Sequence, residues 1–457
     1  MTGIKIMRKE DKRMNYQEFK DLVFETAKAN GLTEYELYYK ESQSTELGAF
    51  GGEINAFSSS DSAEAGLRCV CGGHIGYAST SLFTAEEADS LVERAMENAL
   101  SMEKEEPVLF CKGGLEYREV NPRVVEDIPT SQMVEIALKA LQCCREADER
   151  VTASSMTSAV IQHSTTCLDN SNGVHLQNTT HVGAVIPQVI VTEGGETCDA
   201  HDFKLGNLHE ADLEKLAKET VQKALDKMGA GVPDSGKYPL VLSNSAMSSL
   251  LGVFSSAFSA ENAQNGLSLM KGKEGTQIAA ECVTLLDNPF YEESFRQSSF
   301  DAEGTPAKCK AVVDKGVLTT LLHNLATAAK AGVESTGNAS RGSVDSPITV
   351  RPTNFYFQPG EYTAEELYEK AGEGVLVTGL GGLHAGADFV TGDFSLQSSG
   401  FMIRGGKKAE PVKSFTIAGN FYQMLKDITA LGNDMELGLS CIGSPSVLVS
   451  EITVAGK

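Results

Sequence analysis

The 457-residue sequence contains no tryptophan and no long apolar run. No stretch approaches the roughly 18 consecutive apolar residues that a membrane helix needs, and no apolar signal-peptide core follows the start. Basic residues are also scarce, because 39 Lys and Arg stand against 62 Asp and Glu and the net charge is −23. This charge repels phosphate backbones, and no basic stripe offsets it. The sequence therefore predicts a water-soluble, cytoplasmic protein that contacts neither membranes nor nucleic acid directly.

Metal-binding and disulfide patterns of cysteine are absent as well. The ten cysteines include no Cys-x-x-Cys pair and follow no regular spacing. Most of them lie inside apolar patterns, where a free thiol acts as a small hydrophobic side chain. We therefore expect buried, reduced cysteines in a reducing compartment.

The first half of the chain alternates helical and strand-like patterns. Residues 1–13 show no apolar period and are predicted to be a disordered lead-in. The apolar spacing predicts helices over 15–30, 130–147 and 209–228, and Thr84-Ala85-Glu86-Glu87 predicts a capping box at the start of another helix. Residues 35–81 favour a short antiparallel sheet, and Asn172-Gly173 is a strong hairpin signal. Because the strands come in runs between helices, we predict an α+β domain over 14–228 with a loose internal duplication.

The second half has a different composition. A segment over 229–236 contains glycine and proline and is predicted to be a linker. Beyond it, one helix fits 245–259 and another begins near Asn420, and strands fit the remaining apolar runs at 308–314, 317–321, 348–358, 387–404, 411–418 and 446–454. Residues 237–457 are therefore predicted to form a mainly antiparallel, glycine-rich β-sheet domain with embedded helices.

Motifs that would identify a chemistry are few. A zinc peptidase presents two histidines to one ion with a glutamate beside them, and the one His-Glu pair, His209-Glu210, is followed by no second histidine at the required spacing. An alternative metal site could form if the nearby histidines of one predicted sheet converge; these are His163, His175, His181 and His201, with Cys198. Candidates for a cleft or a peptide-binding surface are Asp301, Glu303, His384 and Asp393. Acidic residues beside glycine are more often simple turn formers.

Several sequence blocks resemble the TldD/PmbA family, whose members are described as modulators of DNA gyrase. The blocks are Gly66-Leu67-Arg68, Gly76-Tyr77-Ala78-Ser79-Thr80-Ser81, Asp301-Ala302-Glu303-Gly304-Thr305-Pro306, Thr391-Gly392-Asp393-Phe394-Ser395, Ser399-Gly400-Phe401, Thr416-Ile417-Ala418-Gly419-Asn420 and Gly432-Asn433-Asp434. The resemblance covers nearly the whole chain after about residue 14. Each block alone is weak, but their order along the chain is specific.

The resemblance also implies which kind of subunit this is. TldD-type members carry His-Glu-x-x-x-His at the start of the C-terminal domain and a cysteine near the C-terminus. The matching positions here hold Gly252, Val253 and Ala257, which cannot bind zinc, and Cys441 remains as one isolated match. The chain therefore resembles the PmbA (TldE) branch, and we expect no cofactor on this chain, with zinc only on a TldD-type partner.

The resemblance implies a part in proteolysis, peptide maturation and antitoxin turnover. The expected partners are a TldD-type subunit or a second copy of this chain, and the expected substrates are unfolded peptides. An extended peptide could add to a free edge strand of the glycine-rich sheet through main-chain hydrogen bonds. Two alternatives stay open at this point: a homodimeric peptide-binding module without catalysis, and a peptidase with an unrecognised metal site.

Overall fold

A computed structural model describes residues 14–102 and 109–457, so the predicted lead-in over residues 1–13 lies outside the described residues. We call residues 14–228 the N-terminal region and residues 237–457 the C-terminal region. The elements of the N-terminal region are α1 (Tyr16–Ala29), β1 (Tyr35–Phe50), β2 (Glu53–Cys71), β3 (His74–Thr80), α2 (Ala85–Leu100), α3 (Thr130–Ala147), β4 (Met156–Asn170), β5 (His175–Glu193), β6 (Glu196–His201), β7 (Lys204–Leu205), the 3-10 helix η1 (Leu208–Glu210) and α4 (Leu213–Leu225).

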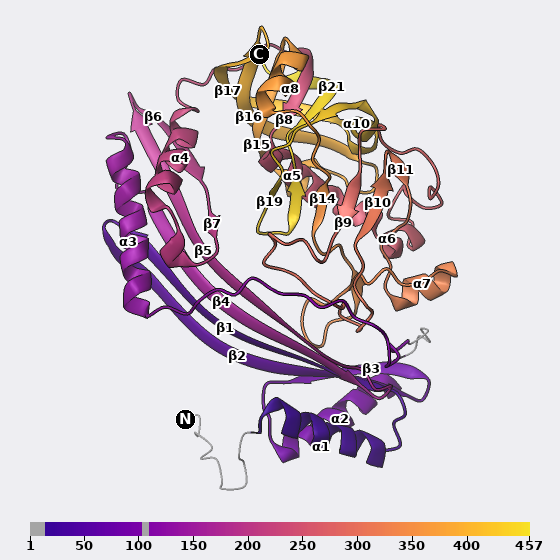
Figure 1. Ribbon diagram of the computed structural model, residues 1–457. Helices are drawn as coiled ribbons and strands as arrows, with labels where there is room; N and C mark the ends of the chain where they lie inside the picture. The colour runs from indigo at the N-terminus through magenta and orange to yellow at the C-terminus, as the bar shows by residue number, and fades with distance from the viewer. Residues whose placement is uncertain (1–13, 103–108) are drawn as a thin grey trace.

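All strands of the N-terminal region belong to one antiparallel sheet. Its strand order is β3-β2-β1-β4-β5-β6, with β7 beside β5. A helix, a run of strands and a second helix follow one another twice, with three strands in the first set and the short β7 and η1 added in the second. The first strands of the two sets, β1 and β4, pair at the centre. This is the arrangement expected of the loose duplication. The long strands curve alongside the C-terminal region, with α1 and α2 packed at one end and α3 and α4 at the other (Figure 1).

Local sequence signals place most boundaries of this region correctly. The hydroxyl of Thr84 accepts the Glu87 N–H at 3.2 Å and caps α2 at the predicted position. The turn between β4 and β5 lies at Asn172-Gly173, and Gly173 has a φ of 83°, which favours glycine. The hairpin turn and the N-cap of α2 are confirmed. The predicted capping box is only half formed, because the Glu87 carboxylate accepts Arg94 Nη2 at 2.7 Å instead of bonding back to the cap.

Two predictions for the N-terminal region are wrong in extent. The predicted short sheet over 35–81 contains strands of 16 and 19 residues, because β1 and β2 pair through polar stretches in which no alternation marks a strand. The helix predicted over 209–228 begins only at Leu213, since the Asp212 carboxylate caps the Lys215 N–H and residues 208–210 form a 3-10 turn.

The C-terminal region contains more strands than helices. Its elements are β8 (Gly236–Leu242), α5 (Asn244–Phe254), the 3-10 helix η2 (Ser255–Phe258), α6 (Ala260–Gln264), β9 (Leu285–Asp287), β10 (Lys310–Asp314), β11 (Val317–Leu318), α7 (Leu325–Ala331), β12 (Ala339–Ser340), β13 (Thr349–Val350), β14 (Phe355–Phe357), α8 (Ala364–Ala371), β15 (Gly374–Gly381), α9 (Leu383–Gly386), β16 (Asp393–Arg404), β17 (Lys407–Asn420), α10 (Phe421–Asp427), β18 (Ile428–Leu431), β19 (Glu436–Leu437), β20 (Ile442–Ser444) and β21 (Val447–Ala455).

Two six-stranded sheets enclose the largest hydrophobic core. Their orders are β11-β10-β9-β14-β20-β19 and β17-β16-β15-β8-β21-β18. Most pairs are antiparallel, but β8 pairs with β15 and β14 with β20 in parallel. In the core, the buried rings of Phe254 and Phe421 stack with centroids 4.4 Å apart. The predicted α+β class, with embedded helices in a mainly antiparallel C-terminal part, is confirmed. Within the described residues, no helix combines the length and apolar content needed to span a membrane.

Several elements of the C-terminal region are shorter than predicted, among them β11 and β16, and two others are interrupted. The helix predicted over 245–259 changes from α5 to η2 after Phe254, where the Ser255 hydroxyl donates to the Gly252 carbonyl at 2.8 Å. The strand predicted over 348–358 is interrupted between β13 and β14. There Pro352 has no N–H for a ladder, and the Thr353 N–H donates instead to Asp287 at 2.7 Å.

Candidate functional site

The positions that the family resemblance assigns to zinc lie at the junction of α5 and η2. Gly252 is half-buried near the end of α5, and an added Cβ there would meet nothing within 4 Å. Val253 is also half-buried and packs against the main core. Ala257 lies on η2, fully buried in that core. Hydrogen, isopropyl and methyl groups offer no electron pair to a metal, so these three side chains cannot bind zinc.

Cys441 lies close to this junction. Its backbone carbonyl accepts the Phe355 N–H at 2.9 Å, and the Phe355 ring contacts Phe258 of η2 with centroids 5.6 Å apart. The residue is fully buried with a φ of 60°. Burial raises the pKa of its thiol, and Arg296 and Ser294 oppose that rise. A buried thiol held protonated is a weak metal ligand, because zinc binds the thiolate.

The set of donors at this junction does not fit zinc. The junction provides one protonated thiol, whereas zinc takes three or four protein ligands. Over residues 14–102 and 109–457, no group of three His, Cys, Asp or Glu side chains is arranged to hold a metal ion. We therefore derive no catalytic step through a metal on this chain.

The histidines of the alternative metal site do not converge. His163 and His181 face each other across β4 and β5, with 2.5 Å between their Nδ1 atoms, and His163 also contacts Asp127. His175 lies at the hairpin end and contacts Asp169 at 2.6 Å, and His201 pairs with Gln188 in β5. This alternative group does not form among the described residues, because the long strands spread these positions along the sheet.

Asp301 and Glu303 lie instead in a buried cluster of charges between the two regions. The N-terminal region contributes Glu36 on β1 and Arg68 on β2. The C-terminal region contributes Arg341 and the two predicted carboxylates. Glu36 accepts Arg68 Nε at 2.8 Å and Nη2 at 3.2 Å, and Arg341 also donates to it. All five side chains are less than a tenth exposed, so no peptide reaches Asp301 or Glu303 in this conformation.

The cluster holds three carboxylates against two guanidinium groups. Burial raises the pKa of Asp301 to about 6, although its carboxylate accepts the N–H groups of Glu303, Thr305 and Ala339, each at 2.9 Å, and these bonds favour the ionised form. Glu303 accepts one backbone N–H, from Leu325 at 2.8 Å, and lies 3.9 Å from Arg68. Burial and the neighbouring Asp301 carboxylate raise the pKa of Glu303 to about 7. A proton on Glu303 balances the charges of the cluster.

This arrangement predicts a pH dependence that Glu303→Gln should remove. A raised carboxyl pKa adds stability that is complete below the ordinary value and is lost as the pH rises through the raised value. The wild type should therefore lose stability relative to Glu303→Gln between about pH 4.5 and pH 7. Urea unfolding of both proteins at pH 5, 6, 7 and 8 measures this difference.

The exposed glutamate Glu25 of α1 provides the matched control, because Glu25→Gln changes the same charge away from the cluster. Its stability difference from the wild type should show no such trend. A Glu303→Gln difference that stays constant from pH 5 to pH 8 would contradict the assignment of the proton to Glu303.

The other two predicted site residues lie elsewhere on the C-terminal region. His384 is exposed on the four-residue helix α9. Asp393 is exposed at the start of β16 and accepts the Asn420 side chain at 2.9 Å. No hydrogen bond or ion pair among the described residues joins either of them to Asp301 or Glu303. A peptide-binding role for His384 and Asp393 stays a prediction.

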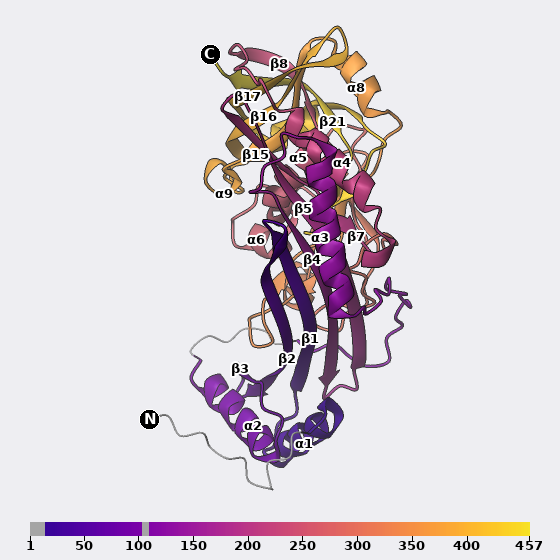
Figure 2. The same ribbon diagram turned by 90° about the vertical axis from the view of Figure 1, so that its left-hand side faces the viewer.

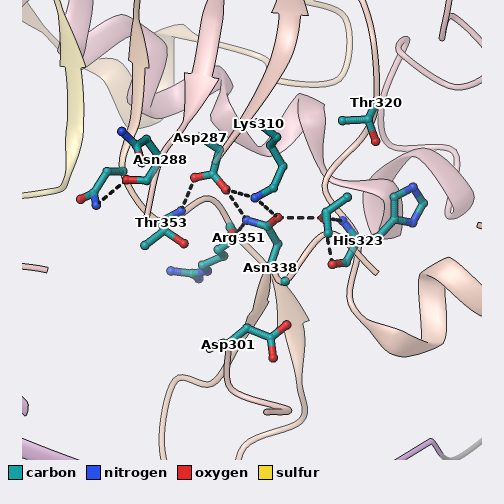
Figure 3. Close-up of polar contacts among 12 residues, drawn as sticks. Asp287, Asn288, Asp301, Lys310, Thr320, His323, Asn338, Arg351 and Thr353 are labelled. Carbon is teal, nitrogen blue, oxygen red and sulfur yellow. Dashed lines mark hydrogen bonds and ion pairs between the residues drawn. The ribbon is translucent and has the colours of Figure 1, made fainter. Parts of the chain in front are cut away.

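A second polar cluster, which the sequence does not indicate, surrounds the buried carboxylate of Asp287 on β9 (Figure 3). Asp287 accepts Lys310 Nζ at 2.8 Å and Asn338 Nδ2 at 2.7 Å. The residue after Asn338 is Ala339, whose N–H reaches Asp301, so one short segment connects the two clusters. The Asp287 oxygens are occupied by donors from three segments, which makes this group a structural link rather than a free base.

Family comparisons agree with this architecture. Models of the PmbA/TldA metallopeptidase family match as domain 1 over residues 35–99, as the central domain over 123–228 and as the C-terminal domain over 235–456. A metalloprotease of Methanothermobacter thermautotrophicus is 32% identical over 332 residues, which are 70% of this chain and 71% of that protein. The metalloprotease PmbA of Escherichia coli O157:H7 is 25% identical over 72% of this chain and 71% of its own.

Solved structures share the complete fold. A proposed DNA-gyrase modulator of Thermotoga maritima superposes with a TM-score of 0.89 at 30% identity, covering 96% of this chain and all of that one. TldE of Thermococcus kodakarensis superposes with a TM-score of 0.87 at 22% identity, covering 96% of this chain and 99% of its own. On the matched domains and on these similarities, the chain belongs to the PmbA/TldD metallopeptidase family.

Proposed function

We propose that this chain is the PmbA/TldE-type subunit of a TldD/TldE-type metalloprotease system, without a zinc site of its own. The observation that carries the proposal is the side-chain chemistry at the junction of α5 and η2. Gly252, Val253 and Ala257 occupy the positions of the family zinc motif and provide no ligand and no general base. A chain of this family with those residues contributes to proteolysis through binding and assembly rather than through the hydrolytic step.

The natural setting that fits this role is the cytoplasm, with unfolded peptides as substrates. The catalytic zinc would belong to a TldD-type partner, and this chain would complete the cavity that holds the peptide. Peptide maturation and antitoxin turnover are the processes that such a complex would serve. In the absence of that partner, the chain would pair with a second copy of itself, since subunits of one fold can share one pairing mode.

The test is peptidase activity on an unfolded peptide, measured for the purified chain alone and mixed with a TldD-type subunit, while zinc is counted per chain. We expect cleavage in the mixture only, with zinc bound by the partner and less than one tenth of an equivalent on this chain. Cleavage by this chain alone, together with one zinc per chain, would overturn the proposal.

A further inference from the structure

The outer side of β2 has no strand neighbour over most of its length. β2 pairs with β1 from Glu53 to Cys69, but β3 covers its other side only from Ala65 to Cys71. Over the described residues, no strand pairs with the open side of residues 53–64. The β1–β2 hairpin rises from the end of the sheet near α1 and α2 with β2 as its outer strand (Figure 2). At about 3.4 Å per residue, this free edge is roughly 40 Å long.

The register shows which backbone groups face outward. The Val70 N–H donates to the Glu34 carbonyl at 2.9 Å, on the β1 side. Hydrogen bonds of successive strand residues point to opposite sides, and the register is regular from Ala56 onward. The N–H and C=O groups of Phe57, Ser59, Asp61 and Ala63 therefore point to the open side. They form a ladder with the spacing that an added strand requires.

Burial does not explain why this segment is a strand. Ten of the twelve residues from 53 to 64 are exposed, and Phe57 is 59% exposed. The helix α3 packs on one face of the hairpin near its turn, at Leu47, Ala49 and Ile54, whereas residues 55–62 of β2 are exposed. A long, uncovered edge is a template for another chain, and natural proteins usually protect such edges with lysine, proline or short strands. From residue 53 to residue 67, β2 contains neither lysine nor proline.

The charge of the edge indicates the kind of strand that fits it. Between residues 53 and 67, the charged side chains of β2 are all acidic, namely Glu53, Asp61 and Glu64. β1 adds Glu41 and Glu46 on the neighbouring strand, where Lys40 lies opposite Glu64 and leaves Glu53 and Asp61 as the acidic side chains of β2 without a basic residue opposite. Antiparallel pairing of the full segment with a second copy would place Glu53 opposite Glu64 at both ends, and like charges directly opposite each other are destabilising. An extended peptide with lysine or arginine side chains meets opposite charges instead.

We propose that residues 57–63 of β2 bind an extended, basic peptide segment as an added strand. This inference rests on the proposed function, since it locates on this chain a place where the peptide substrate is held. Main-chain hydrogen bonds to Phe57, Ser59, Asp61 and Ala63 make the binding tolerant of sequence, and the acidic side chains select for positive charge. The site lies on the N-terminal sheet and not on the glycine-rich sheets of the C-terminal region, where the sequence alone would place an edge.

Ser59→Pro tests the edge directly. Proline removes the outward N–H of Ser59 but leaves the ladder to β1 intact, because outward positions of edge strands tolerate proline. The probe is a fluorescent ten-residue peptide of alternating lysine and threonine, and its binding is followed by anisotropy. We expect Ser59→Pro to weaken binding at least tenfold and Ser59→Ala, which keeps the N–H, to leave it unchanged. Asp61→Asn should weaken binding severalfold at low salt and have little effect at high salt.

The same peptide with N-methyl groups on alternate residues is a second measurement that does not depend on the folding of a variant. It should bind the wild type at least tenfold more weakly than the unmodified peptide. Equal affinity of both peptides, or of the wild type and a folded Ser59→Pro protein, would overturn the edge site. A dimer that Ser59→Pro dissociates without a change in peptide affinity would also overturn it and assign the edge to a second copy.

Different results would overturn the proposed subunit role and the proposed peptide site on the β2 edge. Cleavage by the mixture with a TldD-type subunit reports on the proposed function. If that mixture cleaves unfolded peptides equally well with wild-type and Ser59→Pro chains, the edge site is wrong and the subunit role stands. If the edge binds the probe as expected but no mixture cleaves peptide, the subunit role is wrong and the edge is a binding site of another purpose.

Discussion

Replacing Glu36 with alanine should lower the free energy of unfolding by about 3–5 kcal/mol, because it leaves buried guanidinium groups without their counter-charge. Glu36 is fully buried and accepts hydrogen bonds from both Arg68 and Arg341. Among the described residues, the carboxylate nearest to Arg68 would then be Glu303 at 3.9 Å, and the Phe110 ring 4.5 Å away carries no charge. Arg341 would keep the Ala302 carbonyl and the ring of Tyr38, neither of which carries a charge. Urea unfolding at pH 7 measures the loss.

The matched control is Glu410→Ala, which removes one of the two carboxylates that contact Arg404, in a pair that is about half exposed on both sides (52% and 54%). Exposed ion pairs contribute less than about 1 kcal/mol, so this variant should unfold near the wild-type midpoint. Because Glu36 and Arg341 belong to different regions, Glu36→Ala should also increase proteolysis between them. A Glu36→Ala protein as stable as Glu410→Ala would contradict a role for this cluster in joining the regions.

The buried cluster of charges between the two regions shows what can and cannot be predicted from the sequence. Asp301 and Glu303 were identifiable as cleft candidates, although acidic residues beside glycine are more often simple turn formers. Their surroundings could not be identified from the sequence, because Glu36, Arg68 and Arg341 come from three segments that only the folded chain brings together. No local pattern distinguishes a carboxylate that faces solvent from one that faces two arginines.

The sequence predicted the start of α2 but not the length of β2, and the physical reason is the same. The start of α2 depends on residues within one turn, so Thr84 and Glu87 predict it from sequence. The length of β2 depends on its register with β1, which continues through Ser58-Ser59-Ser60 where alternation is absent. The sheet predicted from the sequence was therefore too short, and the free edge of β2 was not identified. Likewise, the positions of the family zinc motif could be matched on the chain, but their surroundings at the α5–η2 junction could not be foreseen.

Introducing histidine at Ala257 should cost about 3 kcal/mol or more, because it adds a ring to a filled core and buries an imidazole without a hydrogen-bond partner. Ala257 is fully buried among the apolar side chains of the main core. The matched variant is Gly252→His, five residues earlier at the family's other histidine position. An added Cβ there meets nothing within 4 Å, and histidine exceeds glycine in helix propensity, so its stability should stay within about 1 kcal/mol of the wild type.

Comparing these two variants tests whether the junction is filled by side chains or still has space for a metal site. If the core closed around Ala257 when the metal site was lost, zinc will not restore stability to Ala257→His or to a double variant with Gly252→His. Thermal unfolding with and without equimolar zinc then gives the same midpoint for each protein. If the junction has kept the space of a zinc site, Ala257→His will be as stable as Gly252→His, and zinc will raise the midpoint of the double variant. We expect the first result, since the methyl group of Ala257 is packed on all sides. That packing stabilises the C-terminal region with apolar contacts.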